Sequence, residues 1–418
     1  MRRIAAASMV GTTLEYYDFA VYNSLAALIF NRVFFPSFDP WSGTILAFAT
    51  FAVGYLARPI GGMIFGRLGD RRGRRFVLMA TLILMGLATT LMGVLPSYAT
   101  SGIISPILLV ALRFVQGAAL GGEWAGAVLL SLEHGTQDRR GLNASWAQMG
   151  PSLGTLLATA TIALLSLGLS ADEFQSWGWR VPFAASMVLV GFGLWIRTGV
   201  DETPVFEELR ARHSVAEQPI GEVLRHHWRR LVVAGGARIG SDVLYSLLIV
   251  FTLTYLTTVL QLSRTLALTA VSIGGAFNVL GVPFFGALSD RFGRRPVYGC
   301  GALLGVAWAF FFFRLLDSLN PNLIVFAVTS GFLIHAVMYG PQAAFITEQF
   351  PTRVRYAGSS MAYTLVGIVG GGLAPVMFAT MFRAFGTTLA ISLYLTAALC
   401  VTGGALLMAR ETSHLPLE

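Results

Sequence analysis

The feature that most constrains this chain is the spacing of its charged residues, which fall in bursts separated by long apolar stretches. The segments 265–289 and 384–409, for example, contain no charged residue. At about 1.5 Å of rise per residue, a helix of this length crosses a hydrocarbon core of roughly 30 Å. Because 55% of the residues are hydrophobic and only 12% are charged, most of the surface must face lipid.

We expect these stretches to be helices. A membrane β-barrel needs short segments that alternate with period two, and segments such as 76–95 show no such alternation. The sequence therefore predicts an all-α membrane protein of about twelve transmembrane helices. The predicted helices cover residues 5–31, 42–68, 76–95, 103–132, 141–168, 180–196, 230–260, 265–289, 296–316, 321–349, 356–382 and 386–409.

The net charge of +8 comes from arginine alone, since the chain has no lysine. Most arginines flank the helix ends that share a side with both termini, whereas few flank the other ends. The positive-inside rule therefore predicts that both termini lie in the cytoplasm, and it explains the charge without nucleic acid as a partner. The arginines at the opposite ends are Arg32, Arg180, Arg264, Arg314 and Arg383.

The first apolar run is predicted to be a retained helix rather than a signal peptide, because it lacks a small-residue cleavage pattern and contains Glu15 and Asp18. Cys300 and Cys400 both fall in predicted helices. We expect no disulfide framework, no metal cluster and no cofactor.

The chain divides nearly in half at its one long polar stretch. We predict a first six-helix bundle at 1–197, a cytoplasmic linker at 198–229 and a second bundle at 230–418. The pattern G-x-L-x-D-R-x-G-R-R occurs at 66–75 and again at 286–295, at equivalent places in the two halves. Glu133 with Arg140 likewise matches Glu348 with Arg355. These matches indicate two pseudo-symmetric, parallel repeats.

The doubled pattern resembles the signature of the major facilitator superfamily, over essentially the whole chain. Further segments resemble its metabolite:H⁺ symporter branch, whose members carry shikimate, α-ketoglutarate, citrate, or proline and glycine betaine. Residues 30–133 look most like shikimate transporters, although Tyr16 stands where the family often has tryptophan. The matching segments are Glu15-Tyr16-Tyr17-Asp18-Phe19, Ala57-Arg58-Pro59-Ile60-Gly61-Gly62, Arg113-Phe114-Val115-Gln116-Gly117, Gly121-Gly122-Glu123-Trp124, 176–183 and 370–375.

Ionisable residues inside predicted helices are costly in lipid, at roughly 2.5–3.5 kcal/mol each at the bilayer centre, so each needs a reason. Glu15, Asp18 and Tyr22 share one arc of the first helix, which we expect to face a central cavity. One of these carboxylates, or Glu123 in the fourth helix, would carry a proton across the membrane. The alternative is a hydrogen-bonded structural acid that never titrates.

The fourth helix places Arg113, Gln116, Glu123 and Trp124 within one arc. Arg113 is the predicted substrate ligand, because a guanidinium stays protonated and can bind a carboxylate through two parallel hydrogen bonds. An equally good interpretation is a counter-ion to Glu123 or to an acid of the first helix. An Arg113 that exchanges partners when substrate and proton arrive would combine both roles.

Two helices of the second half complete the predicted substrate site. Their candidate residues recur at i, i+4 and i+7, and so lie on one face of each helix. Arg238 and Asp242 are close enough to neutralise each other, which alone would explain their presence. His335 is either a proton relay or a neutral hydrogen-bonding residue. The candidates are Arg238, Asp242 and Tyr245 in the seventh helix and His335, Tyr339 and Gln342 in the tenth.

Acidic and basic residues at the cytoplasmic helix ends form a predicted gate. By the family resemblance, salt bridges among them would hold the cytoplasmic face closed and break when it opens. Simple topology anchoring explains the arginines but not the acids. The predicted gate residues are Asp70, Arg71, Arg74, Arg75, Glu133, Arg140, Asp290, Arg291, Arg294, Arg295, Glu348 and Arg355.

The sequence and the resemblance together predict a secondary active transporter of the bacterial inner membrane that takes up a small organic acid with protons. We expect it to work as a monomer, with lipid, protons and a small molecule as its partners. One alternative is proton symport of a zwitterion such as proline or glycine betaine. Another is proton-driven efflux, suggested by Gly150-Pro151-Ser152-Leu153-Gly154. A sensor with a transporter fold is a third.

No catalytic residues are predicted, because the chain lacks the H-E-x-x-H and G-x-S-x-G motifs. It also lacks the G-x-x-x-x-G-K-[ST] loop of ATP-driven pumps. The chain is therefore not expected to be an enzyme.

Overall fold

The computed structural model describes residues 2–72, 74–121, 124–133, 137–198 and 219–413, and these residues are almost entirely helical. The first half contains long helices that follow the predicted order. They are α1 (Arg2–Leu28), α3 (Pro40–Arg72), α4 (Arg74–Gly93), α6 (Ile104–Leu120) with α7 (Trp124–Glu133), α8 (Arg140–Gly168) and α10 (Val181–Thr198). Short helices α2 (Phe30–Phe34), α5 (Tyr98–Ser101) and α9 (Ala171–Ser176) connect them at one end.

The second half repeats this order with two interrupted helices. The first is α13 (Trp228–Ser246), which continues through a π-helical turn (Leu247–Phe251), α14 (Thr252–Thr254) and a second π-helical turn (Tyr255–Val259). The other is α18 (Arg355–Gly367), which passes through a π-helical turn (Ile368–Gly372) into α19 (Ala374–Phe385). Between them lie α15 (Arg264–Phe292), α16 (Arg294–Asp317) and α17 (Pro321–Glu348), and α20 (Leu389–Met408) comes last.

The helix starts follow from local sequence. The Ser263 hydroxyl accepts a hydrogen bond from the Leu266 N–H at 3.2 Å, which satisfies one free donor at the start of α15. Pro321 occupies the first turn of α17, where its missing N–H costs nothing. The predicted linker contains a further helix, α12 (Pro219–His226), whose Val223 is fully buried, and α13 begins at Trp228. Residues 199–218 of that linker lie outside the described residues.

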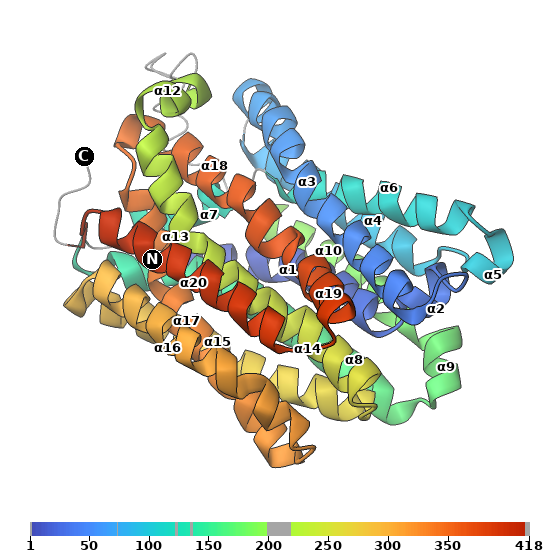
Figure 1. Ribbon diagram of the computed structural model, residues 1–418. Helices are drawn as coiled ribbons and strands as arrows, with labels where there is room; N and C mark the ends of the chain where they lie inside the picture. Colours follow the sequence, from blue (N-terminus) through green and yellow to red (C-terminus); the bar gives the residue numbers. More distant parts are fainter. Residues whose placement is uncertain (1, 73, 122–123, 134–136, 199–218, 414–418) are drawn as a thin grey trace.

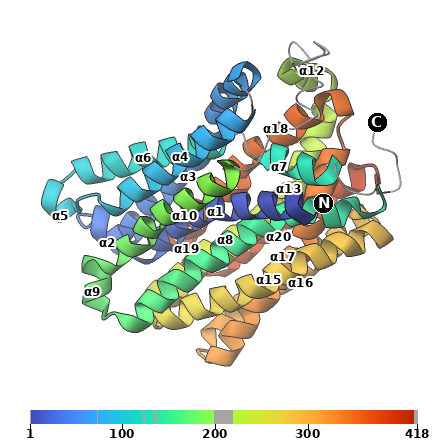
Figure 2. The same cartoon turned by 180° about the vertical axis from the view of Figure 1, so that it is seen from behind.

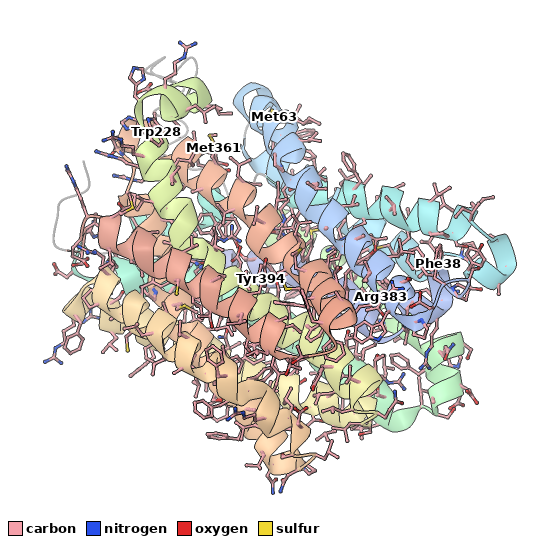
Figure 3. All side chains as sticks on the ribbon, viewed as in Figure 1. Phe38, Met63, Trp228, Met361, Arg383 and Tyr394 are labelled. Atoms are coloured by element: carbon pink, nitrogen blue, oxygen red, sulfur yellow. The ribbon has the colours of Figure 1, made fainter. Side chains whose placement is uncertain are left out.

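The prediction of an all-α membrane fold is confirmed. Within the described residues, eight helices are long and apolar enough to cross a membrane, and Met79–Gly93 and Ile104–Leu120 are shorter apolar helices. Helix α1 begins and α20 ends at the end of the bundle that carries α12 (Figures 1 and 2). Figure 3 shows Trp228, Met361 and Met63 toward that end and Phe38 and Arg383 toward the other.

The two halves contact each other through several helix pairs. Helix α8 packs along α15, α3 packs on α19 and on the π-helical turn before it, and α7 meets α18. Figures 1 and 2 show the first half, in blue to green, beside the second half, in yellow to red. Side chains carried by α1, α3, α7, α13 and α18 therefore meet near the middle of the molecule.

Glycine sets the separation of α3 from α6. A Cβ atom on Gly117 would collide with the backbone of Gly54, and one on Gly61 would collide with the backbone of Ala118. Small residues at a helix crossing let two backbones approach closely, as is common between membrane helices. This contact fixes the position of Arg58, which lies on α3 between Gly54 and Gly61.

Candidate functional site

A pocket lies between the two halves. The helices α1, α3 and α7 and the end of α6 line it from the first half, and α18 lines it from the second. Its lining residues are Thr12, Glu15, Tyr16, Arg58, Leu120, Gly121, Trp124, Ser360, Tyr363 and Thr364. A ligand bound there would touch both halves at once, which is the arrangement needed for alternating access.

Arg58 is the arginine of this pocket, and it is buried, with 3% of its surface exposed. Its guanidinium carbon lies 3.9 Å from the ring centre of Tyr55 and 4.6 Å from that of Phe19. Among the described residues, its Nε and Nη2 atoms have no hydrogen-bond partner. These two nitrogens form one edge of the guanidinium, and that edge matches the two oxygens of a carboxylate.

Arg58 is not among the site residues predicted above from the sequence. Its position inside the predicted helix 42–68 was a usable signal, because an arginine in the middle of a membrane helix needs a functional or structural reason.

Arg113, the predicted substrate ligand, is fully buried and is not among the residues that line the pocket. One Nη atom donates to Gln116 and the other donates to Asn23 at 3.3 Å. Its guanidinium carbon lies 3.9 Å from the ring centre of Phe19 and 4.1 Å from that of Tyr22. The structure thus brings Arg113 and Gln116 together, as predicted, but inside the first bundle. A role in substrate binding stays a prediction.

The two acids of α1 have different surroundings. Glu15 lines the pocket, whereas Asp18 does not. Both are buried, and Oδ1 of Asp18 has no hydrogen-bond partner among the described residues. Tyr22 also lies away from the pocket, with its hydroxyl bonded to Thr50. The third predicted proton carrier, Glu123, lies outside the described residues.

Arg238 and Asp242 form the predicted ion pair on α13. Nε of Arg238 donates to Oδ1 of Asp242 at 3.0 Å, and Nη2 lies 3.0 Å from Oδ2. The third nitrogen, Nη1, donates to the main-chain carbonyl of Tyr363. The guanidinium edge that Arg58 leaves free is therefore occupied in Arg238.

Tyr363 joins this ion pair to the pocket, although neither a charge nor a motif distinguishes it in the sequence. Its ring stacks on Trp124 with a centroid distance of 3.8 Å and an interplanar angle of 11°. The guanidinium carbon of Arg238 lies 3.4 Å from the centre of the same ring. The Tyr363 hydroxyl is bonded to that of Tyr16 at 2.8 Å.

The remaining candidates of the second half form a separate cluster. The His335 ring stacks on Tyr245 and on Tyr339, with centroid distances of 4.7 and 4.8 Å. Nδ1 of His335 lies 3.0 Å from the Asn278 amide nitrogen. This cluster reaches the first half, because Ser152 donates to Asn278 at 2.6 Å.

Two further contacts complete the arrangement around that cluster. The Tyr245 hydroxyl is bonded to Thr155 of α8 at 2.6 Å. Gln342 points elsewhere and donates to the Tyr298 hydroxyl at 2.7 Å. Thr155 and Asn278 were not predicted as site residues, and Ser152 was named only as part of residues 150–154, because small polar residues are common in membrane helices.

Part of the predicted gate forms a connected network. Arg294 lies 2.7 Å from Asp290 and 3.3 Å from Glu348, and Arg140 of the other half lies 3.4 Å from Glu348. The Asp290 carboxylate also accepts the N–H of Gly141 at 2.7 Å. These contacts cross between α8 of the first half and α15 and α17 of the second.

The other predicted gate residues lie apart from this network or outside the described part. Nε of Arg295 donates to the Leu406 carbonyl at 2.8 Å, and Nε of Arg355 donates to the Phe350 carbonyl at 3.1 Å. The guanidinium carbon of Arg291 lies 5.5 Å from the ring centre of Phe292. Outside the described side chains lie Asp70, Arg71, Arg74, Arg75 and Glu133. A gating role for the whole set stays a prediction.

The segment after α20 adds to the network. The Thr412 hydroxyl donates to Glu348 at 2.7 Å. The main-chain carbonyls of Thr412 and Ser413 accept from Nη2 of Arg140 at 3.2 and 2.8 Å. The last described residues of the chain therefore bridge the two halves.

Glu411 caps the start of α16. Its carboxylate accepts the N–H of Arg294 at 3.0 Å and that of Arg295 at 2.9 Å. Burial opposes ionisation, but the backbone N–H groups of Arg295 and Arg294 hold the pKa of Glu411 below its usual value. A lowered pKa in the folded state means that the cap stabilises the fold above the unfolded-state pKa, and that this stabilisation disappears as the pH falls through the folded-state pKa.

We therefore expect Glu411→Gln to lower the melting temperature by a few degrees near neutral pH. The difference from the wild type should close on acidification, because the wild-type carboxylate then becomes protonated. Thermal unfolding at several pH values checks this, with the exposed Asp172→Asn as the control. A difference that stays constant with pH would contradict the ionised cap.

At the opposite end, Arg383 joins α19 to the start of α3 and to Asp39 just before it. One Nη atom donates to the Ser42 hydroxyl at 2.6 Å, and the other lies 3.3 Å from the Asp39 carboxylate. Trp41 packs on Phe382, with ring centres 5.1 Å apart. The halves thus touch at both ends of the bundle.

Comparisons with known proteins agree with this arrangement. The chain is 39% identical to the shikimate transporter of Escherichia coli (strain K12), over 99% of this chain and 95% of that protein. It is also 39% identical to the inner membrane metabolite transport protein YhjE of the same organism, over 99% and 94%. Identity to the proline/betaine transporter of Salmonella typhimurium is 33%, over 100% and 85%.

Solved structures show the same fold. The crystal structure of D-xylose-proton symporter matches with a TM-score of 0.76 over 97% of this chain and 96% of that chain, at 20% sequence identity. A family model described as Major Facilitator Superfamily matches residues 8–375 and, in a second match, residues 234–415. The chain therefore belongs to the major facilitator superfamily, as a multi-pass membrane transporter of the metabolite type and not an enzyme.

Proposed function

We propose that this protein is a proton-coupled symporter of the bacterial inner membrane that takes up a small organic acid such as shikimate. The observation that carries the proposal is the buried Arg58, which lines the pocket together with Glu15 and whose Nε and Nη2 atoms have no hydrogen-bond partner among the described residues. A buried cation with free donors is costly unless a ligand supplies the acceptors, and a carboxylate does so with the right geometry.

Three further observations support the choice of substrate and mechanism. Two relatives are named as a shikimate transporter and a metabolite transport protein. The pocket draws residues from both halves, so a rocking motion of the bundles would expose it to each side in turn. Glu15 is a buried carboxylate that lines the same pocket, and we propose it as the proton acceptor. We propose the monomer as the working unit.

Uptake into energised proteoliposomes tests the function. Purified protein would be screened with shikimate, dicarboxylates, aromatic acids, proline and glycine betaine, with and without an imposed proton gradient. We expect accumulation of a carboxylate only while the gradient is present. Accumulation that persists after the gradient is collapsed would contradict proton symport.

A zwitterionic osmolyte is the second candidate. The stacked rings of Trp124 and Tyr363 and the carboxylate of Glu15 line the same pocket, and a quaternary ammonium group binds such surfaces. A relative named as a proline/betaine transporter shares 33% of its residues with this chain. The same screen separates the two, because betaine and proline would then be accumulated in preference to shikimate.

The proton carrier is tested by Glu15→Gln and, separately, Asp18→Asn. Neutralising the carrier should abolish uphill uptake but spare exchange of substrate across the membrane, because exchange needs no net proton movement. Each variant serves as the control for the other, since the two acids lie within one turn of α1 and only Glu15 lines the pocket. If both variants still accumulate substrate, the proton site lies elsewhere.

A further inference from the structure

We propose that the face of Trp124 covered by Tyr363 is a ring-binding subsite, and that the ring of a compact alicyclic acid displaces the Tyr363 ring from it. We name this face the ring site. The inference rests on the proposed function, and it specifies the shape of the acid. In this role, Tyr363 competes with the ligand ring for the face of Trp124 and does not bind the ligand.

The ring site and Arg58 belong to the same pocket. Trp124, Tyr363 and Arg58 all line the same pocket, together with Ser360 and Thr364, whose hydroxyl groups suit a hydroxylated ligand. An acid whose carboxylate is bound at Arg58 therefore has the Trp124–Tyr363 stack within the same enclosure. Trp124 belongs to the first half and Tyr363 to the second, so their stack opens when the halves separate.

The stack itself has a geometry that a ligand can improve. Its rings are nearly parallel, at 11°, with centroids 3.8 Å apart. Aromatic pairs prefer offset or edge-to-face arrangements with centroids about 4.5–7 Å apart, because two π faces of the same sign repel. A saturated or partly saturated ring presents C–H groups to Trp124, and these carry the opposite partial charge. An alicyclic ring is therefore a better partner for Trp124 than the Tyr363 ring.

Two contacts hold Tyr363 in this arrangement. Its hydroxyl is bonded to Tyr16 at 2.8 Å, and the Arg238 guanidinium lies 3.4 Å from its ring centre. Displacement by a ligand would break the first contact and change the second. Occupancy of the pocket would thereby be transmitted from the first half to the Arg238–Asp242 pair of the second.

The experiment measures equilibrium affinity of the purified full-length protein for two monocarboxylates, shikimate as the ring probe and D-gluconate as the open-chain probe. In the wild type, the binding free energy of shikimate must offset the free energy of moving the Tyr363 ring. We expect Tyr363→Leu to bind shikimate about three- to tenfold more tightly and to leave D-gluconate nearly unchanged. Tyr363→Phe, which loses only the bond to Tyr16, should tighten shikimate binding about two- to threefold.

Two further variants make the outcome decisive. Trp124→Leu should lose the preference for shikimate over D-gluconate, since it removes the ring site. Tyr394→Leu removes a half-buried tyrosine of α20, which packs on Phe378 away from the pocket, and should change neither affinity.

Weaker shikimate binding in both Tyr363 variants would overturn the inference, because Tyr363 would then be an ordinary ligand contact. If acids bind through Arg58 and this weakening is seen, the proposed function stands and only the ring site falls. If neither acid binds the wild type, the ring site fails, and the proposed function fails as well only if the uptake screen finds no accumulated acid.

Discussion

Arg58→Lys is expected to weaken carboxylate binding by at least about tenfold, while Arg113→Lys leaves it near normal. Lysine keeps the positive charge but replaces the two parallel donors of the guanidinium edge by a single ammonium group. Among the described residues, both nitrogens of that edge are unpartnered in Arg58, which lines the pocket. Arg113 lies away from the pocket, with its two Nη atoms bonded to Gln116 and Asn23 and only Nε unpartnered.

Binding of the transported acid to each purified variant is the measurement, by calorimetry or by radioligand retention. The two substitutions are matched, because both replace a buried arginine in the first half. A large loss in Arg113→Lys with none in Arg58→Lys would restore Arg113 as the substrate ligand. No loss in either variant would indicate that charge rather than fork geometry dominates, since lysine keeps the charge.

Glu348→Gln is expected to cost roughly 3–5 kcal/mol of unfolding free energy, because it removes a buried negative charge that two buried arginines share. Glu348 is 1% exposed in its side chain, as is Arg294, and Arg140 is 4% exposed. The carboxylate lies within 3.4 Å of both guanidinium groups. Removal of one negative charge therefore disturbs the contact between the halves as well as the fold.

Thermal or detergent-induced unfolding checks this expectation, and an alkylation assay of a cysteine placed near the network would report its opening. Glu173→Gln is the matched control, because Glu173 caps the exposed helix α9 on the other side of the molecule. Loss of the Glu173 carboxylate should lower the unfolding free energy much less, since water partly replaces an exposed cap. A Glu348→Gln variant as stable as the control would argue against a stabilising network.

Much of the fold could be predicted from the sequence, because lipid leaves few choices. An apolar segment without charges must be a helix, and 265–289 indeed lies inside α15. The Arg238–Asp242 pair was also predictable, since residues four apart face each other on any helix. The π-helical turns in the second half were not, because no residue type signals them.

The candidate site was predictable only in part. Helical rotation places Glu15 and Asp18 on one arc, yet only Glu15 reaches the pocket, because the boundary between bundle core and pocket depends on where α3 and α18 pack. The contrast between Arg58 and Arg113 has the same origin. Whether an arginine is free depends on partners far away in the sequence, such as Asn23 for Arg113.

The gate shows a similar limit. The repeat matches Glu133 with Glu348 and Arg140 with Arg355. In the structure, Arg140 of the first half contacts Glu348 of the second. A repeat pattern reveals which residues are equivalent, but it carries no information on which copy each one contacts.

The contacts of residues 411–413 bear on how the protein is handled in the laboratory. Glu411 caps α16, and the carbonyl groups of Thr412 and Ser413 hold an arginine of the other half. A purification tag or fluorescent protein should therefore be joined beyond residue 418 through a spacer, and trimming the chain to Met408 for crystallisation would remove the bridge. A reporter dye attached next to residues 411–413 would report this contact, since its surroundings would change whenever the two halves separate.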